Sequence, residues 1–471
     1  MIYSNHPRPA DLKAISDVTL SPFWLTDPAR PAAGAPLSGA HAADLVVVGA
    51  GFSGLWSALL AKEADPAREV IVLEAERVAS GASGRNGGFC SASLTHSFEN
   101  GLGRWPREMP ALLRMGLENL NGIEETVRRY SIDCDFTRSG ELTAALNESE
   151  AQDFKREVEQ GARFGKTFIL LDRQQMQARV NSPLYQAGVL DPDAAMLNPA
   201  RLAWGLRRAC LGLGVRLFEQ SPVQRLEETR SAVILHTPQG HVRARRVALA
   251  TNAYPPLVKH LSLYMAPVYD YVLMTEPLTE SQRAAIGWRG REGLGDSANQ
   301  FHYSQITADG RILWGGYDAI YHWNNGFRPE LENRPETFAR LSAHFFQTFP
   351  QLEGLRFTHA WGGVIDTCSR FTAFWGKAMG GKLAYVLGYT GLGVGASRFG
   401  AQVMLDLLDG CATERAALTM TRTRPIPFPP EPFRSPIINF TRWSLDRADR
   451  SGGRRNLWLK LLDALGLGFD S

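Results

Sequence analysis

The chain has few cysteines and little net charge for its length. Its five cysteines are odd in number and widely spaced along 471 residues: Cys90, Cys134, Cys210, Cys368 and Cys411. No Cys-x-x-Cys pair occurs, so the sequence indicates neither a disulfide framework nor a zinc site, and we expect no metal. The formal charge of +3 gives no reason to expect a nucleic acid or another polyanion as a partner.

Long apolar runs are also missing. No run approaches the ~18 residues that a membrane span needs, so we expect no integral membrane segment. The start of the chain, Met-Ile-Tyr-Ser-Asn-His-Pro, has no basic stretch followed by an apolar one, and this argues against a signal peptide. A cytoplasmic location is therefore the expectation. The length predicts two or three domains, and 44% hydrophobic and 21% charged residues are typical of globular proteins.

A glycine-rich turn after a short apolar run is the clearest local signal. The run at 45–48 leads into Gly49-x-Gly51-x-x-Gly54, and a segment of small and apolar residues follows. This order predicts a strand, a tight turn and a helix whose N-terminus faces a pyrophosphate. The predicted phosphate-binding residues are Gly49, Gly51, Phe52, Ser53 and Gly54.

A second apolar strand supports the same interpretation. It covers 69–73 and ends at Glu74, which lies 20 residues after Gly54, where a dinucleotide site places a carboxylate for the ribose hydroxyls. We assign Glu74 and the adjacent Ala75 to the cofactor site. The alternative is an ordinary βαβ unit with an incidental acid.

The next segment is too rich in glycine and serine for a stable helix or strand. It reads Ser80-Gly-Ala-Ser-Gly-Arg-Asn-Gly-Gly-Phe-Cys90, directly after the ribose-binding acid. We expect it to wrap the cofactor through Gly81, Ala82, Ser83, Arg85, Asn86, Gly87 and Gly88, with Arg85 and Asn86 bringing donors toward the reactive ring. The alternative is a flexible surface loop.

Later segments alternate between two kinds of structure. Spacings of three and four predict helices at 112–130 and 149–164, whereas 136–146 resembles a strand pair outside the first domain. The strand at 242–249 ends in small residues and then Thr251-Asn252, which returns the chain to the cofactor. Strand-like segments at 267–277 and 301–317, with a hairpin signal at Asp309-Gly310, predict an antiparallel sheet.

A second glycine-rich loop lies far along the chain. A strand at 382–387 precedes Gly388-Tyr-Thr-Gly-Leu-Gly-Val-Gly-Ala396, and a helix at 397–408 follows. The helix N-terminus is again suited to negative charge, and we assign Gly391, Leu392, Gly393 and Val394 to the site. The short amphipathic helix expected at 457–465 either touches a membrane surface or, as we favour, packs on the body.

These segments predict a fold class and a division into domains. The fold class is an α/β, Rossmann-type dinucleotide-binding domain plus an α+β substrate domain with a mainly antiparallel sheet. The expected parts are an N-terminal arm (1–43) anchored by Phe23 and Trp24, a cofactor domain (44–125, 198–262 and 370–415), which the resemblance given next makes an FAD-binding domain, a substrate domain (126–197 and 263–369) and a C-terminal extension (416–471).

With these motifs in hand, the chain resembles the D-amino acid oxidase superfamily of FAD enzymes, and within it γ-glutamylputrescine oxidase-like amine oxidases. The resemblance spans residues 20 to 412. The motifs that carry it are Gly81-Ala-Ser-Gly-Arg-Asn-Gly-Gly88, Ala250-Thr-Asn-Ala-Tyr254, Gly310-Arg-Ile-Leu-Trp-Gly-Gly316, Trp361-Gly-Gly-x-Ile-Asp-x-x-x-Arg370 and Gly388-Tyr-Thr-Gly-x-Gly-Val394.

The resemblance implies FAD as the cofactor. Glu74 would hold the adenosine ribose, Val223 would contact adenine through its backbone, and the loop at 391–394 would face the pyrimidine edge of the flavin. Thr251, Asn252 and Gly363 are further expected cofactor contacts.

Three departures from the family pattern affect the expected flavin contact, substrate and electron acceptor. Leu392 stands where the family often has His, and the apolar Ile365 stands near the place of a carboxylate-binding Arg, which argues against a simple α-amino acid. No Lys occurs between Gly315 and Pro335, where the sarcosine oxidase branch places an oxygen-activating Lys and where His322 is the nearest base-like group.

The implied reaction is removal of hydride from a carbon next to nitrogen in a secondary or N-substituted amine. Molecular oxygen is the expected acceptor, with hydrogen peroxide as a product, and the oligomeric state stays open. The candidate catalytic residues are Tyr269, His302, Tyr303, Trp361 and Arg370, with Tyr271 and Tyr317 as further wall residues. Each aromatic side chain has an alternative as packing, His302 as a structural histidine, and Arg370 as an ion-pair partner of Asp366 rather than a clamp for a substrate carboxylate.

Two other function classes remain open at this stage. One is a flavoprotein of another class, such as a monooxygenase or an NAD-linked enzyme. The other is a non-catalytic flavin-binding protein.

Overall fold

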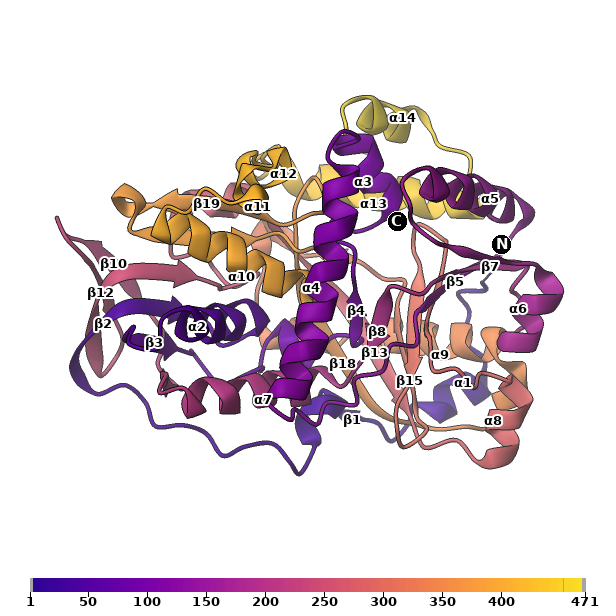
Figure 1. Ribbon diagram of the computed structural model, residues 1–471. Coiled ribbons are helices and arrows are strands. Elements are labelled where there is room, and N and C mark those ends of the chain that lie inside the picture. The colour runs from indigo at the N-terminus through magenta and orange to yellow at the C-terminus, as the bar shows by residue number, and fades with distance from the viewer. Residues whose placement is uncertain (1–2, 452, 468–471) are drawn as a thin grey trace.

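The computed structural model describes residues 3–451 and 453–467. Two large sheets organise this part of the chain (Figure 1). The eight-stranded sheet has the order β10-β11-β12-β2-β3-β9, with β20 beside β12 and β19 beside β20. Its strands are β2 (Gly39–Val48), β3 (Val70–Leu73), β9 (Arg216–Phe218), β10 (Arg225–Glu228), β11 (Val233–His236), β12 (Gly240–Leu249), β19 (Phe374–Ala378) and β20 (Leu383–Leu387).

The centre of this sheet is parallel. β2 lies between β12 and β3, all three run in the same direction, and β20 joins β12 in the same sense. Residues 45–48 are all buried, as a strand covered on both faces requires. On one side, α2 (Phe52–Ala64) packs against α7 (Pro199–Gly212) and α10 (Gly393–Asp409). The Rossmann-type architecture expected from the sequence is therefore confirmed.

The ten-stranded sheet is mainly antiparallel, with the order β1-β18-β13-β16-β15-β14-β5-β7-β6 and β17 beside β13. Its strands are β1 (Thr19–Leu20), β5 (Glu141–Ala145), β6 (Ile169–Leu171), β7 (Ala187–Asp191), β13 (Ala266–Thr275), β14 (Gly293–Asp296), β15 (His302–Ile306), β16 (Ile312–Gly316), β17 (Ile320–Tyr321) and β18 (Phe357–Thr367). A two-stranded ladder joins β4 (Phe89–Ser91) to β8 (Ala194–Met196).

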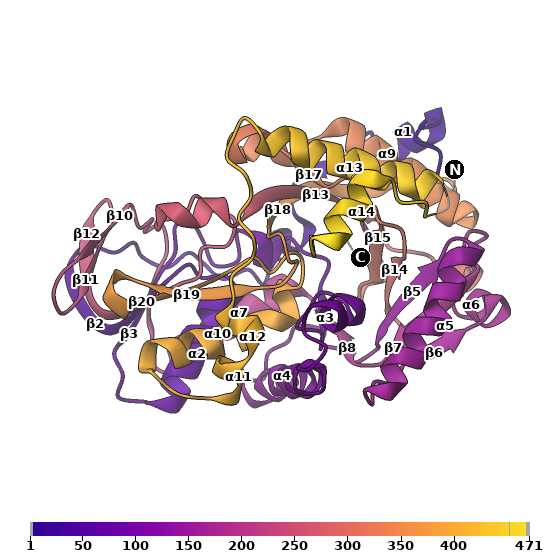
Figure 2. The ribbon, with the colours of Figure 1, turned by 90° about the horizontal axis from the view of Figure 1, so that it is seen from above.

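The other helices cover these sheets or carry the ends of the chain. They are α1 (Pro9–Ala14), α3 (Phe98–Arg104), α4 (Met109–Arg129), α5 (Glu148–Arg163), α6 (Arg173–Arg179), α8 (Glu280–Ile286), α9 (Pro335–Thr348), α11 (Glu414–Ala417), α12 (Thr419–Arg422), α13 (Arg434–Arg450) and α14 (Leu457–Ala464). α1 packs on α9, and β1 extends the ten-stranded sheet beside β18, so the start of the chain joins the second sheet. Figure 1 shows α14 at the top of the molecule, and the view from above shows it beside α13 (Figure 2).

Candidate active site

A cavity of about 760 Å³ is lined by residues of the first glycine-rich turn, the 80–90 loop, the second glycine-rich loop and the ten-stranded sheet. Ligand sites usually have volumes of roughly 300–1,000 Å³. The cavity therefore joins both glycine-rich motifs to the second sheet, although these segments lie hundreds of residues apart in the sequence.

Two hydrogen bonds connect the glycine-rich segments. The backbone N–H of Phe52 donates to Oγ of Ser83 at 2.9 Å, which attaches the 80–90 loop to the start of α2. Oγ of Ser53 donates to the hydroxyl of Tyr389 at 2.9 Å, which links α2 to the second glycine-rich loop. The serine hydroxyls that we expected to bind phosphate thus also hold the loops in position.

The glycines of the first turn allow close backbone contact. A Cβ atom on Gly54 would lie 1.9 Å from the carbonyl oxygen of Gly49, and one on Gly49 would lie 2.5 Å from the carbonyl oxygen of Ala250. Gly49 also has a φ of +99°, which a residue with a side chain rarely adopts. The turn brings β2, α2 and the end of β12 together as the motif predicts.

Glu74 marks the end of the site opposite the ten-stranded sheet. Its carboxylate accepts hydrogen bonds from the N–H of Ala50 at 2.7 Å and of Glu76 at 2.9 Å. Burial raises the pKa of Glu74. The N–H of Ser221 donates to the carbonyl oxygen of Glu74 at 2.7 Å, so the segment that carries Val223 runs beside this acid. Neither Glu74 nor Val223 lines the cavity, and their roles at the adenosine end of the cofactor stay predictions.

The 80–90 loop is held by its own polar side chains. Nε of Arg85 donates to the carbonyl oxygen of Ser80 at 2.7 Å, and its guanidinium pairs with Glu332. Nδ2 of Asn86 donates to the carbonyl oxygen of Ala82, and its Oδ1 accepts from the N–H of Gly88 at 2.8 Å. Arg85 and Asn86 line the cavity, but the hydrogen bonds of their side chains shape the loop.

The arm reaches this loop through Trp24. Its Nε1–H donates to the carbonyl oxygen of Asn86 at 2.9 Å, and the side chain is buried. Trp24 is therefore an anchor, as expected.

The far wall of the cofactor region is the N-terminus of α10. The N–H of Gly388 donates to Oδ2 of Asp366 at 2.6 Å, and burial raises the pKa of Asp366 to about 7. The N–H of Leu392 donates to the carbonyl oxygen of Tyr389 within the turn. The first N–H groups of α10 have no acceptor within the helix and carry its positive dipole.

Two buried hydroxyls in this region have no hydrogen-bond partner among the described residues, namely Oγ of Ser397 and Oγ1 of Thr251. Ser397 lines the cavity, and Thr251 follows β12 next to the cavity residue Asn252. Buried polar atoms without a partner are costly. Together with the cradle of glycines, these hydroxyls fit a polar dinucleotide.

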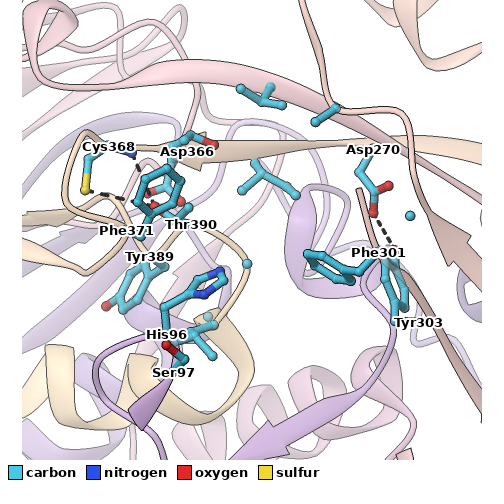
Figure 3. A pocket seen from close by; sticks show the side chains of 18 of the residues that line it. His96, Ser97, Asp270, Phe301, Tyr303, Asp366, Cys368, Phe371, Tyr389 and Thr390 are labelled. Carbon is cyan, nitrogen blue, oxygen red and sulfur yellow. Dashed lines mark hydrogen bonds between the residues drawn. The ribbon is translucent and has the colours of Figure 1, made fainter. Parts of the chain in front are cut away.

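The wall formed by the ten-stranded sheet carries an acid and a phenol in contact (Figure 3). The hydroxyl of Tyr303 donates to Oδ2 of Asp270 at 2.5 Å. Burial raises the pKa of Asp270 to about 6. Gly363 lies opposite Asp270 on β18 and also lines the cavity.

Four of the predicted catalytic residues do not line the cavity. His302 is buried, with Nδ1 at 2.8 Å from Asp296 and Nε2 at 2.9 Å from His344, so it serves the core. The hydroxyl of Tyr269 bonds to the backbone of Arg328. Nε1 of Trp361 donates to the carbonyl oxygen of Arg85 at 2.9 Å, which places Trp361 directly behind the loop.

Arg370 takes neither of the two roles that we considered. Its guanidinium donates to the backbone carbonyl oxygens of Thr372, Thr423, Ala373 and Met420. It is buried, and burial lowers its pKa to about 10. Arg370 therefore attaches the segment before α13 to the body, and its guanidinium bonds to backbone carbonyl groups instead of to Asp366.

Asp270 and His96 are two of the cavity residues that were not predicted. Asp270 stands between Tyr269 and Tyr271, which we singled out, and strand alternation alone would have placed it on the opposite face. His96 lines the cavity with a φ of +73°, and burial lowers its pKa to about 4. No motif marks His96. His322, by contrast, is half-buried against Tyr269 outside the lining, and burial lowers its pKa.

Fold and site together define a dinucleotide-dependent oxidoreductase whose cavity extends onto an antiparallel sheet. Residues 44–407 match the family model described as "DAO: FAD dependent oxidoreductase". The chain belongs to this family, and its cofactor is FAD. The resemblance inferred from the motifs is confirmed.

Individual relatives are consistent with this family assignment. The chain is 32% identical over 390 residues to gamma-glutamylputrescine oxidoreductase of Escherichia coli (strain K12), covering 82% of this chain and 88% of the relative. It is 31% identical over 387 residues to the probable oxidoreductase OrdL of Haemophilus influenzae, covering 80% and 85%. The crystal structure of glycine oxidase from Geobacillus kaustophilus has a TM-score of 0.67 at 20% identity, covering 81% of this chain and 99% of that one, and shows the shared fold.

Proposed function

We propose that this protein oxidises the C–N bond of a secondary or N-substituted amine that carries positive charge. Family membership supplies the class of reaction. The name of the Escherichia coli relative supports an N-substituted amine as the substrate class. We further infer that the domain built on the eight-stranded sheet binds the cofactor and that the ten-stranded sheet binds the substrate.

The observation that carries the substrate class is the charge of the cavity wall. Nine carboxylic acids line it, against the guanidinium groups of Arg85 and Arg442. The acids are Glu99, Glu141, Glu150, Asp153, Glu157, Asp270, Asp296, Asp318 and Asp366. Asp318 is paired with Arg334 and Arg340, and burial raises the pKa of Glu141, Glu157 and Asp366 to about 7, so these four acids contribute less negative charge near neutral pH. The remaining carboxylates, Asp270 among them, favour the approach of an ammonium group. The apolar Ile365 also lines the cavity, in keeping with a substrate that is not a simple α-amino acid.

When bound, FAD supplies the acceptor for the hydride that leaves the carbon next to nitrogen. The protein's part is to remove a proton from the incoming ammonium, since only the neutral amine has the lone pair that expels hydride. Asp270 suits this role because it lines the cavity and contacts Tyr303, and its carboxylate takes up a proton near pH 6. The imine that results adds water and yields a carbonyl compound and an amine.

Other residues keep the site dry and hold it open. Phe301, Phe371 and Tyr389 contribute aromatic surface to the cavity (Figure 3), and burial against such surface disfavours the ammonium form. The N-terminus of α10 directs positive potential at the cofactor region, which favours negative charge there.

The electron acceptor is a separate part of the proposal. We propose molecular oxygen, with hydrogen peroxide as the product, and keep a dehydrogenase as the second candidate because no Lys occurs between Gly315 and Pro335. A cytoplasmic location also belongs to the proposal.

Anaerobic reduction of the holoenzyme tests this function. We expect an N-alkylated diamine to bleach the flavin absorbance faster than glycine, sarcosine or other zwitterionic amino acids. Bleaching by NADPH and by no amine would overturn the proposal in favour of another flavoprotein class. Readmitting oxygen and measuring peroxide then separates an oxidase from a dehydrogenase.

A further inference from the structure

The C-terminal extension exposes an unusual amount of apolar surface. Of the large apolar side chains exposed among the described residues, half lie between 426 and 465: Ile426, Phe433, Phe440, Trp443, Leu457, Leu461 and Leu465. We call the last six the C-terminal patch. Concentrated exposed apolar surface usually marks an interaction site.

The leucines of the patch share one face of α14. Leu457, Leu461 and Leu465 follow each other at spacings of four, and their exposed fractions are 86%, 50% and 56%. The opposite face holds α14 in place, because Leu459 is fully buried against Leu445 and Ala448 of α13. The exposed leucines are therefore not needed for packing within the described chain.

Aromatic side chains continue the patch onto α13. Phe440 stacks on Trp443 with ring centres 5.5 Å apart and meets Trp458 of α14 at 5.7 Å. Nε1 of Trp458 donates to Oγ1 of Thr441 at 2.9 Å. These contacts connect the exposed aromatic side chains of α13 to α14, and Figure 2 shows the two helices side by side.

The C-terminal extension accounts for the net positive charge of the protein. Residues 416–471 contain nine basic and five acidic residues, a net charge of +4, whereas the whole chain carries +3. Arg447, Arg454 and Lys460 are exposed beside the patch, and the guanidinium of Arg447 lies 5.6 Å from the ring centre of Trp443. The C-terminal extension thus combines exposed apolar side chains with exposed cations, and Arg447 contacts the patch directly.

We propose that the C-terminal patch docks on the surface of an anionic lipid bilayer. Leucine and aromatic side chains enter the boundary between headgroups and acyl chains, and nearby Lys and Arg are attracted by anionic lipids. A second copy of the chain is a poorer occupant because it would bring the same positive charge to the same patch. None of the described helices is long and apolar enough to cross a bilayer, so docking is peripheral.

Docking would also place the active-site cavity close to the lipid surface. The inner sides of the same helices line the cavity through Ile437, Leu445 and Leu462. The extension therefore separates the cavity from the proposed lipid surface by the thickness of one helical layer.

Co-sedimentation of the full-length holoenzyme with vesicles tests this inference. We expect binding to vesicles made of equal parts of phosphatidylcholine and phosphatidylglycerol, weakened by salt, and little binding to phosphatidylcholine alone. Replacing all three patch leucines (L457S, L461S and L465S) should lower the partition coefficient more than about tenfold. Replacing the three exposed cations (R447Q, R454Q and K460Q) should lower it to a similar extent.

Matched variants on other surfaces serve as controls. Leu12→Ser with Leu117→Ser and Leu211→Ser removes leucines that are 48%, 37% and 42% exposed elsewhere, and binding should persist. Equal binding of the patch and control variants overturns the proposal, as does equal binding to both kinds of vesicle. Concentration-dependent dimerisation without lipid that the patch variants abolish also overturns it. Slower amide exchange in α14 on adding anionic vesicles supports it without any substitution.

Discussion

At the scale of the residue, the contact between Asp270 and Tyr303 makes the sharpest statement about chemistry. The hydroxyl of Tyr303 stabilises the carboxylate form of Asp270, while burial opposes it and leaves the pKa at about 6. If Asp270 accepts the proton of the ammonium, kcat/KM for the amine rises as the pH rises through about 6. This rise is the acidic limb of the pH profile. Asp270→Asn should remove the acidic limb and lower kcat/KM by about 10²–10³-fold.

Tyr303→Phe tests the same pair by a shift of the pH profile of kcat/KM. Loss of the hydroxyl removes a hydrogen bond to the carboxylate, so the pKa of Asp270 and with it the limb should move to higher pH. Tyr269→Phe is the matched control, because its hydroxyl bonds to the backbone of Arg328 outside the cavity lining. A limb that stays in place in Tyr303→Phe would contradict the role of the pair.

The same strands show how far single residues were predictable. Tyr269 and His302 were singled out by residue type, but their neighbours Asp270 and Tyr303 line the cavity. Side chains alternate between the two faces of a strand, so an error of one position reverses the assignment. Tyr303 was named, whereas Asp270 was missed because the sequence alone does not say which face meets the cofactor.

At the scale of the element, the first turn depends on the absence of one side chain. In Gly54→Ala, the new Cβ would lie 1.9 Å from the carbonyl oxygen of Gly49, so α2 must move away from β2. We expect loss of most bound FAD and a lower melting temperature, measured by flavin absorbance and by thermal unfolding. Gly103→Ala is the control, since a Cβ there meets nothing within 4 Å and alanine favours the helix. Normal FAD content in Gly54→Ala would contradict the geometry.

Elements were more predictable than residues. The helix expected at 112–130 is α4 (Met109–Arg129), and the strand expected at 242–249 is β12. The strand pair expected at 136–146 is a single strand, β5, whose partners β7 and β14 come from later in the chain. Local periodicity identifies an element, but the partner of a strand is decided by tertiary packing.

At the scale of the whole molecule, the cavity depends on contacts that no local pattern reveals. The bond between Ser53 and Tyr389 spans 336 residues, and the pair of Arg85 and Glu332 spans 247. The family motifs indicated the first of these neighbourhoods but not the second. The lining contributed by α13 was unpredictable for the same reason, because its amphipathic pattern does not identify what it covers.

The acids of the cavity wall are also a property of the whole molecule, since they come from separate elements that share one enclosed space. Burial raises the pKa of Glu141 and of Glu157 from 4.5 to about 7. The folded state therefore favours their protonated forms, and the stability that this provides below pH 4.5 is lost as the pH rises through about 7. Charged acids that destabilise the fold are expected where they serve a ligand.

Replacing both acids separates stability from function. At pH 8, Glu141→Gln with Glu157→Gln should raise the free energy of unfolding by roughly 1–3 kcal/mol, since no charge is then buried. KM for a cationic amine should rise about tenfold, because the attraction of two carboxylates is lost. Glu159→Gln changes an exposed acid on α5, the helix that also carries Glu157, and should alter neither quantity. Denaturant unfolding and steady-state kinetics at pH 4 and pH 8 measure both effects. A more stable double variant with an unchanged KM would mean that these carboxylates do not face the substrate.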